Sequence, residues 1–140
     1  MVTPYWIETI ENAAGSSADT QVHLFHSSGT TTAIGYNDDG GSEAASSFSF
    51  KSGLVAGLTP GETYYIMVTH YQTDDGAYTL WINNSGFGGG DKSGNPGASA
   101  NKPNDTAGFA TPLTLNTVSD NVLTNPSNSF DWFVFTVPLP

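Results

Sequence analysis

Short segments in which apolar and polar side chains alternate, separated by turn residues, run along most of this chain. The pattern is clearest in "TQVHLFHS", "TYYIMVTHY" and "AYTLWIN", which lie beside the turn signals "SSG", "TPGE" and "DDG". Alternation with period two is typical of strands with one buried face, and Gly, Pro and Asp between such runs favour turns. No amphipathic helix is evident. We therefore predict an all-β fold, an antiparallel β-sandwich or jelly roll of about eight strands.

One face of each predicted strand supplies the candidate core. In residues 20–26, Val22 and Leu24 share one face while His23 and Phe25 share the other, because successive side chains of a strand point to opposite sides. The predicted core comprises Trp6, Val22, Leu24, Phe48, Phe50, Tyr65, Met67, Tyr78, Leu80, Trp132 and Val134.

The amino-acid composition changes after the sixth predicted strand. The stretch "NNSGFGGGDKSGNPGASANKPND" is rich in Gly, Ser, Asn and Pro and holds almost no side chain suited to a core, which indicates a flexible linker. We predict three parts: residues 1–84 as the main part of the sandwich, residues 85–102 as the linker, and residues 103–140 as the strands that complete the sandwich.

Charge and composition narrow the classes of partner. The chain has 13 acidic side chains and 3 basic ones, for a formal net charge of −10. A phosphate backbone would be repelled, so we expect no nucleic-acid partner, and without a long apolar run we expect no membrane insertion. Hard cations such as Ca²⁺ are suitable counter-charges for unpaired carboxylates. The wealth of Thr, Ser and Asn favours an extracellular or cell-surface location.

Four motifs follow one another in order within residues 19–82. They are Asp19-Thr20, Asn37-Asp38-Asp39, Gly61 to Val68 and Gly76 to Leu80. In this order they resemble the bacterial pre-peptidase C-terminal (PPC) domain, which has an Asp-Thr strand, an Asn-Asp-Asp loop, a Gly-Thr-Tyr-Tyr-Val type strand and a Gly-x-Tyr-x-Leu strand. The resemblance implies a PPC-like β-sandwich.

The opening elements of that family are matched at the other end of this chain, by "PNDTAGFATPL" and "FDWFVFTV". The order is therefore rotated relative to the family. Joined together, "FTVPLP" and "TPYWIET" would form an ordinary hairpin, so we expect the chain ends to interrupt that turn. Residues 103–140 then complete residues 1–84 in the same chain, as a circularly permuted monomer, or in a neighbouring subunit. A segment cut from tandem repeats of the family domain is a third alternative.

Donation to a neighbour would run head to tail without closing, and would build a filament. The donated strand would be "FDWFVFTV". The predicted assembly strand comprises Phe130, Trp132, Phe133, Val134, Phe135 and Val137.

Two sets of oxygen ligands are candidates for calcium. The first lies in "YNDDGG" and comprises Asn37, Asp38 and Asp39, which would otherwise form an Asx-rich turn. The second is implied by the resemblance, because PPC-like collagen-binding modules hold calcium near their opening segment, and comprises Asn104, Asp105 and Asp131. The acidic residue that the family often has just before the Asn-Asp pair is missing, since Lys102 and Pro103 stand there.

The sequence offers no constellation for catalysis. No Gly-x-Ser-x-Gly nucleophile elbow is present and there is no cysteine. We assign surface roles to His23, His26 and His70. Three aromatic residues are candidates for a strip that stacks on sugars, with core or inter-subunit packing as the favoured explanation: Tyr64, Tyr71 and Trp81.

These inferences describe a non-catalytic extracellular structural protein. Its expected partner is itself, through donation of the C-terminal strands, with calcium as a stabilising ion. The alternative is a monomeric PPC-type module, attached to a secreted hydrolase, that binds a polysaccharide or a collagen-like protein ligand.

Overall fold

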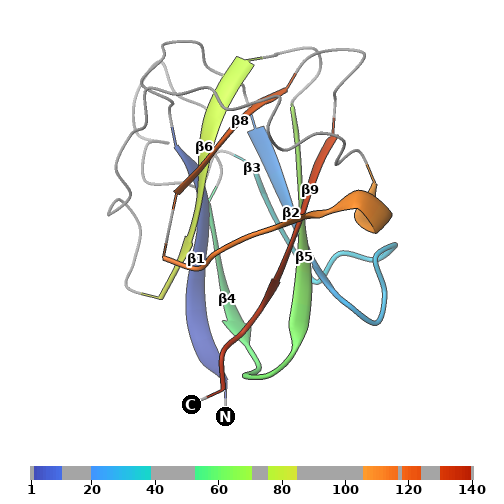
Figure 1. Cartoon of the computed structure of the whole chain (residues 1–140), viewed down its shortest axis with the longest axis vertical. Helices are drawn as coiled ribbons and strands as arrows, with labels where there is room; N and C mark the ends of the chain where they lie inside the picture. The colour runs from blue at the N-terminus through green and yellow to red at the C-terminus, as the bar shows by residue number, and fades with distance from the viewer. Residues whose placement is uncertain are drawn as a thin grey trace.

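The computed structural model describes residues 2–10, 20–38, 53–70, 76–84, 106–116, 118–123 and 130–139. Within these ranges the chain forms nine strands and one short 3₁₀ helix (Figure 1). They are β1 (Thr3–Ile10), β2 (Thr20–His26), β3 (Gly35–Asp38), β4 (Gly53–Leu58), β5 (Thr63–His70), β6 (Gly76–Asn83), η2 (Ala107–Phe109), β7 (Thr111–Pro112), β8 (Val118–Leu123) and β9 (Phe130–Thr136). The prediction of an all-β chain is confirmed.

The strands form two sheets that pack face to face as a sandwich. The order is β4-β1-β6-β8 in the first sheet and β3-β2-β5-β9-β7 in the second. We call them sheet A and sheet B. Neighbouring strands are antiparallel except for β7 and β9, which are parallel, with Thr111 beside Phe133. The predicted antiparallel sandwich therefore ends in a parallel pair at one edge of sheet B.

A single apolar core lies between the sheets and draws on both. It comprises Tyr5, Ile7, Val22, Leu24, Leu58, Tyr64, Ile66, Val68, Tyr78, Leu80, Ile82, Phe133, Phe135 and Val137. Sheet A contributes alternate residues of β1 and β6, and sheet B contributes alternate residues of β2, β5 and β9, as expected for pleated strands. The predicted core positions Val22, Leu24, Tyr78 and Leu80 are confirmed.

Five predicted core residues lie on the opposite face of their strands. These are Trp6, Tyr65, Met67, Trp132 and Val134, none of which is fully buried. Their sequence neighbours occupy the core instead. The error arises because β1, β5 and β9 carry large apolar side chains on both faces, so that alternation alone does not say which face turns inward. Phe48 and Phe50 lie outside the described residues.

Two segments differ from the predicted element types. Residues 118–123 form strand β8, although most of them belong to the stretch "SDNVLTNPSNS", whose polar composition predicts a loop. They do so because they pair with the edge of β6, and such pairing outweighs a polar composition. The sequence also predicts a strand in the preceding stretch, "ATPLTLNTV", which holds the two-residue strand β7 and Val118, the first residue of β8. No helix among the described residues is long and apolar enough to cross a bilayer.

Both ends of the described chain lie at the same end of the sandwich, near the β4–β5 connection (Figure 1). The side chain of Val2 lies against Gly57, and that of Leu139 lies against Gly61. Gly61 has a φ of +88°, which a residue with a Cβ adopts only with strain. The predicted hairpin between β9 and β1 is wrong, because β1 lies inside sheet A and β9 inside sheet B.

Candidate functional site

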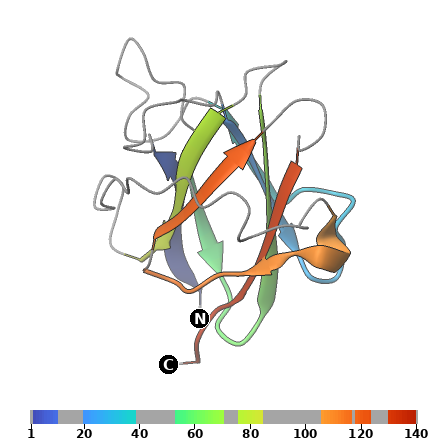
Figure 2. The same cartoon turned by 45° about the horizontal axis from the view of Figure 1, so that its top comes forward.

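The C-terminal segment, defined here as residues 106–139, adds strands to both sheets on the same side of the sandwich. In sheet A, β8 pairs with β6, and in sheet B, β9 pairs with β5 and is followed by the edge strand β7. Figure 2 shows orange β8 beside yellow-green β6, and red β9 beside green β5. Strands β1 to β6 alone would be two three-stranded sheets with β6 and β5 as open edges. The boundary along β5 and β6 is the candidate functional site, and we call it the seam.

Strand β9 is the main contribution of the C-terminal segment to the core. Phe133 is fully buried, Phe135 is 3% exposed, and Val137, just after the strand, is 1% exposed. Burying a large apolar side chain stabilises a fold by about 1.5–3 kcal/mol relative to leaving it in water. Of the predicted assembly strand, these three residues face the core.

The other members of that strand face outward. Trp132 and Val134 are partly buried on the outer face of sheet B, and Phe130 is 46% exposed.

One buried polar contact crosses the core at the seam. The hydroxyl of Tyr78, on β6 of sheet A, donates a hydrogen bond of 2.6 Å to Oδ2 of Asp131, on β9 of sheet B. Tyr78 is fully buried and Asp131 is 1% exposed. A carboxylate in such a place needs partners, because an unpaired buried charge is costly. The contact therefore ties the C-terminal segment to sheet A.

The environment of this pair changes the acidity of the phenol. Burial raises the pKa of Tyr78 well above its usual range, and the nearby Asp131 carboxylate raises it further through its charge and its hydrogen bond. The sequence analysis missed this pair. Asp131 shares its strand face with Phe133 and Phe135, and that parity alone places it toward the core.

Asp131 was predicted as a calcium ligand together with Asn104 and Asp105, which lie outside the described residues. The structure directs Asp131 into the core, toward Tyr78. This calcium set remains a prediction.

The first calcium set is divided between the two faces of β3. Asn37 Oδ1 accepts a hydrogen bond of 3.1 Å from the backbone N–H of Gly53, which begins β4 in the other sheet. Asp38 Oδ2 accepts one of 3.3 Å from Gln21 Nε2, its cross-strand neighbour on β2. Because Asn37 and Asp38 are consecutive in a strand, their side chains point apart. Asp39 lies outside the described residues, and among the residues that the structure describes no three His, Asp or Glu side chains form a group that could hold a metal ion.

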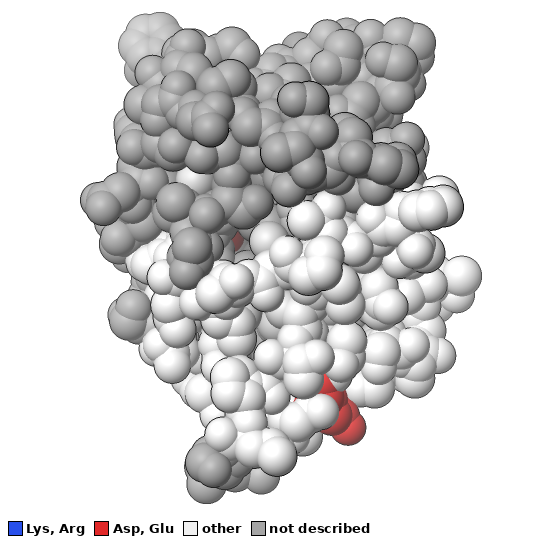
Figure 3. Space-filling view, in the orientation of Figure 1, with Lys and Arg blue, Asp and Glu red and all other residues white. Residues whose placement is uncertain are grey.

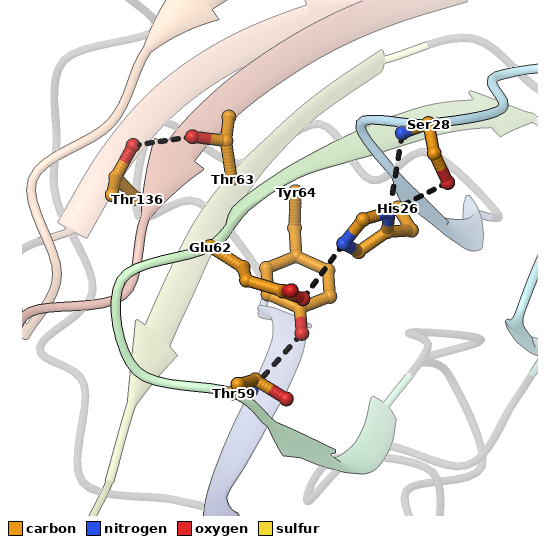
Figure 4. A network of polar contacts seen from close by, with 7 residues as sticks. All are labelled: His26, Ser28, Thr59, Glu62, Thr63, Tyr64 and Thr136. Atoms are coloured by element: carbon orange, nitrogen blue, oxygen red, sulfur yellow. Dashed lines mark hydrogen bonds and ion pairs between the residues drawn. The ribbon is translucent and has the colours of Figure 1, made fainter.

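A polar network connects the turns at the end of the sandwich where the chain ends meet (Figure 4). His26 Nε2 lies 2.7 Å from Glu62 Oε2, and His26 Nδ1 lies 2.7 Å from Ser28 Oγ. The backbone N–H of Ser28 also donates to His26 Nδ1, at 3.1 Å. The imidazole thus caps the turn after β2 and joins it to the turn before β5.

Hydrogen bonds at the same end of the sandwich fix the C-terminal end of β9. The backbone N–H of Val137 donates to the carbonyl of Glu62, at 2.9 Å, and the N–H of Gly61 donates to the carbonyl of Val137, at 2.8 Å. The hydroxyls of Thr63 and Thr136 lie 2.8 Å apart across the β5–β9 pair. The seam is therefore stabilised by backbone hydrogen bonds between paired strands and by apolar packing in the core. At this end it is also stabilised by the side-chain contact of Thr63 with Thr136.

The aromatic strip predicted from Tyr64, Tyr71 and Trp81 does not form. Tyr64 is 4% exposed and its hydroxyl accepts a hydrogen bond from the Thr59 N–H, while Trp81 is 8% exposed. Tyr71 lies outside the described residues. These two buried rings have packing roles, as the favoured explanation held.

Comparisons of the chain with protein-family models, curated proteins and solved structures find no significant match. The PPC resemblance therefore depends on the four quoted motifs.

A double-mutant cycle measures the contact across the seam. We expect Tyr78→Phe to lower the free energy of unfolding by about 1.5–3 kcal/mol, because the hydrogen bond is made to a charged group in the core. Combining it with Asp131→Asn should cost less than the sum of the two single changes. Tyr64→Phe is the matched control, since its hydroxyl serves an uncharged backbone N–H, and should cost about 0.5–1.5 kcal/mol. Additive effects in urea unfolding would contradict an energetic coupling of Tyr78 with Asp131.

The raised pKa of Tyr78 predicts a loss of stability in alkali. Above about pH 10 the unfolded chain ionises this tyrosine while the folded chain keeps it protonated. The stabilisation is complete below that pH and declines as the pH rises toward the folded pKa. Urea unfolding between about pH 8 and pH 11 should show a shallower decline for Tyr78→Phe than for the unaltered chain. Parallel declines would show that Tyr78 is not the group responsible.

Proposed function

We propose that this protein is a non-catalytic extracellular structural subunit that assembles head to tail by exchanging its C-terminal segment. The observation that carries the proposal is the completion of both sheets by this one segment, through β8 on β6 and β9 on β5. The finer fold assignment, a PPC-like jelly roll in rotated order, is part of the same proposal.

Exchange would conserve the contacts of the seam. A subunit that lacked a C-terminal segment would present unpaired β5 and β6 edges, together with the core surface that Phe133 and Phe135 cover. Open edges beside an apolar surface are the features that accept a strand from another chain. The same segment from a neighbour would fill them with the same hydrogen bonds, as in domain swapping.

The geometry of such an exchange favours a filament. Each subunit donates from one part of its surface and accepts at another, so the contact is heterologous and need not close. The long Gly/Ser/Asn-rich stretch between β6 and η2 supplies the reach, since a flexible chain of about 20 residues spans roughly 25 Å.

The second candidate is a monomeric binding module. It is favoured by the packing of the C-terminal segment on its own chain, including the backbone bonds of Val137 to Gly61 and Glu62. The two candidates differ in which chain provides β9 and not in what β9 touches.

A designed disulfide separates the two candidates. The chain has no cysteine, and Thr63 and Thr136 are directly opposite in the β5–β9 register, with hydroxyls 2.8 Å apart. Cross-strand neighbours have Cα separations of about 4.5–5.5 Å, within the range of disulfides. Oxidised Thr63→Cys/Thr136→Cys protein should run as a ladder of covalent multimers on a non-reducing denaturing gel.

The single variants Thr63→Cys and Thr136→Cys are the controls, and should give monomers and at most dimers. A double variant that remains a covalent monomer after oxidation would reject exchange and favour the binding module. Light scattering on the unaltered chain gives the mass of the native species for comparison, against 14.7 kDa for one chain.

Calcium is part of the proposal because the chain is strongly acidic. On the face drawn in Figure 3, nearly all described atoms belong to uncharged residues, and the few charged ones are acidic. No lysine or arginine lies in the described ranges. A bound divalent cation would reduce the repulsion between subunits of net charge −10.

Removal of calcium should lower the melting temperature by a few degrees, because a ligand bound only by the folded state stabilises it by mass action. Asp105→Asn, which changes a predicted ligand, should abolish the response, whereas Asp74→Asn, in a predicted turn, should keep it. Scanning calorimetry in calcium and in chelator makes the comparison. Superimposable melting curves for the unaltered chain would exclude a stabilising calcium site.

A further inference from the structure

Five rings form a continuous series of contacts on the outer face of sheet B. Their centroids are 4.7 Å apart for Tyr36 and His23, 6.5 Å for His23 and Phe25, 5.1 Å for Phe25 and Trp132, and 6.5 Å for Trp132 and Tyr65. These separations are typical of interacting aromatic pairs. We call these five residues the aromatic cluster.

The register of sheet B produces this arrangement. His23 of β2 lies opposite Tyr36 of β3 and Met67 of β5, and Met67 lies opposite Trp132 of β9. One row of side chains therefore crosses four strands, at about 4.8 Å per strand. Phe25, Tyr65 and Val134 form the next row.

The aromatic cluster is exposed to solvent at Tyr36, and the rings of His23 and Trp132 pack on the buried ring of Phe25. Tyr36 is 50% exposed, and His23, Tyr65 and Trp132 are partly exposed, whereas Phe25 is 5% exposed and acts as the base on which its neighbours pack. The rings are thus held in place while part of their surface remains accessible.

Among the described residues of the outer face of sheet B, charge lies along one border of the cluster. The two rows of side chains contain no Asp, Glu, Lys or Arg, and burial lowers the pKa of His23, which favours its neutral form. In the adjoining row, Gln21 donates to Asp38 Oδ2 at 3.3 Å. A band of uncharged rings beside an amide and a carboxylate suits a ligand that has apolar C–H faces and many hydroxyl groups.

The dimensions favour a narrow ligand over a protein partner. The two rows comprise seven side chains, whereas a standard protein–protein interface takes about 20–30 residues from each side. A linear chain of sugar rings needs only a row of stacking surfaces and a few polar groups along one edge.

We propose that the aromatic cluster binds a linear, uncharged polysaccharide whose sugar rings stack on Tyr36, His23 and Trp132. Gln21 and Oδ2 of Asp38 provide hydrogen-bonding groups for sugar hydroxyls along one edge, since Oδ1 of Asp38 is buried. The site is independent of the exchange proposal, because β9 lies beside β5 whichever chain provides it.

The test measures retention of the full chain on insoluble cellulose and insoluble chitin, two neutral linear polysaccharides. We expect retention on at least one of them, and a loss of about three- to tenfold in affinity for Tyr36→Ala, the range that corresponds to one aromatic stacking contact. Val55→Ala is the matched control, since Val55 is also 50% exposed but lies on β4 of sheet A. This variant should bind like the unaltered chain.

A spectroscopic measurement reports on Trp132, the ring that β9 contributes to the cluster. Soluble oligosaccharides of the retained polysaccharide should shift the tryptophan fluorescence of the unaltered chain, and Trp132→Phe should remove that shift while keeping the far-UV circular dichroism of a folded chain. Retention on neither polysaccharide, or equal losses for Tyr36→Ala and Val55→Ala, would overturn the proposal. The non-reducing gel of the oxidised Thr63→Cys/Thr136→Cys variant tests strand exchange without any polysaccharide. A failure of polysaccharide binding and a failure of strand exchange are therefore distinguishable.

Discussion

The fold depends on the closure of two sheets by one segment of chain. Each sheet has a strand edge at the seam, and residues 106–139 cover both edges and the core between them. Ladder hydrogen bonds and apolar burial supply most of the attraction, as in any sandwich. The bond from Tyr78 to Asp131 adds directionality, because it is made only when sheet A and β9 are in one relative position.

This bond also fixes the register of β9. A shift by one residue would turn Phe133 and Phe135 outward, which apolar burial already opposes. A shift by two residues would keep the apolar pattern inside but move Asp131 away from the Tyr78 hydroxyl, leaving a buried carboxylate without this donor. The polar pair therefore excludes the one misalignment that the hydrophobic pattern tolerates.

The sequence was sufficient for the class of fold and for β2, where Val22 and Leu24 differ clearly from their neighbours on the other face. It was insufficient for β5 and β9, because Tyr65, Met67, Trp132 and Val134 are as apolar as the residues that the core takes. The reason is now visible: the outer face of sheet B carries its own cluster of rings. The sequence did not predict strand β8, because its residues are mostly polar and it forms by long-range pairing with β6.

The aromatic cluster spans the boundary between the two parts of the chain. Four of its rings belong to β2, β3 and β5, and the fifth, Trp132, belongs to β9. A polysaccharide bound across them would touch both parts at once and would be released if they separated. By thermodynamic linkage, binding of the polysaccharide would stabilise the packing of the C-terminal segment against β5 and β6. In an exchanged assembly the same ligand would contact two subunits and would stabilise the polymer.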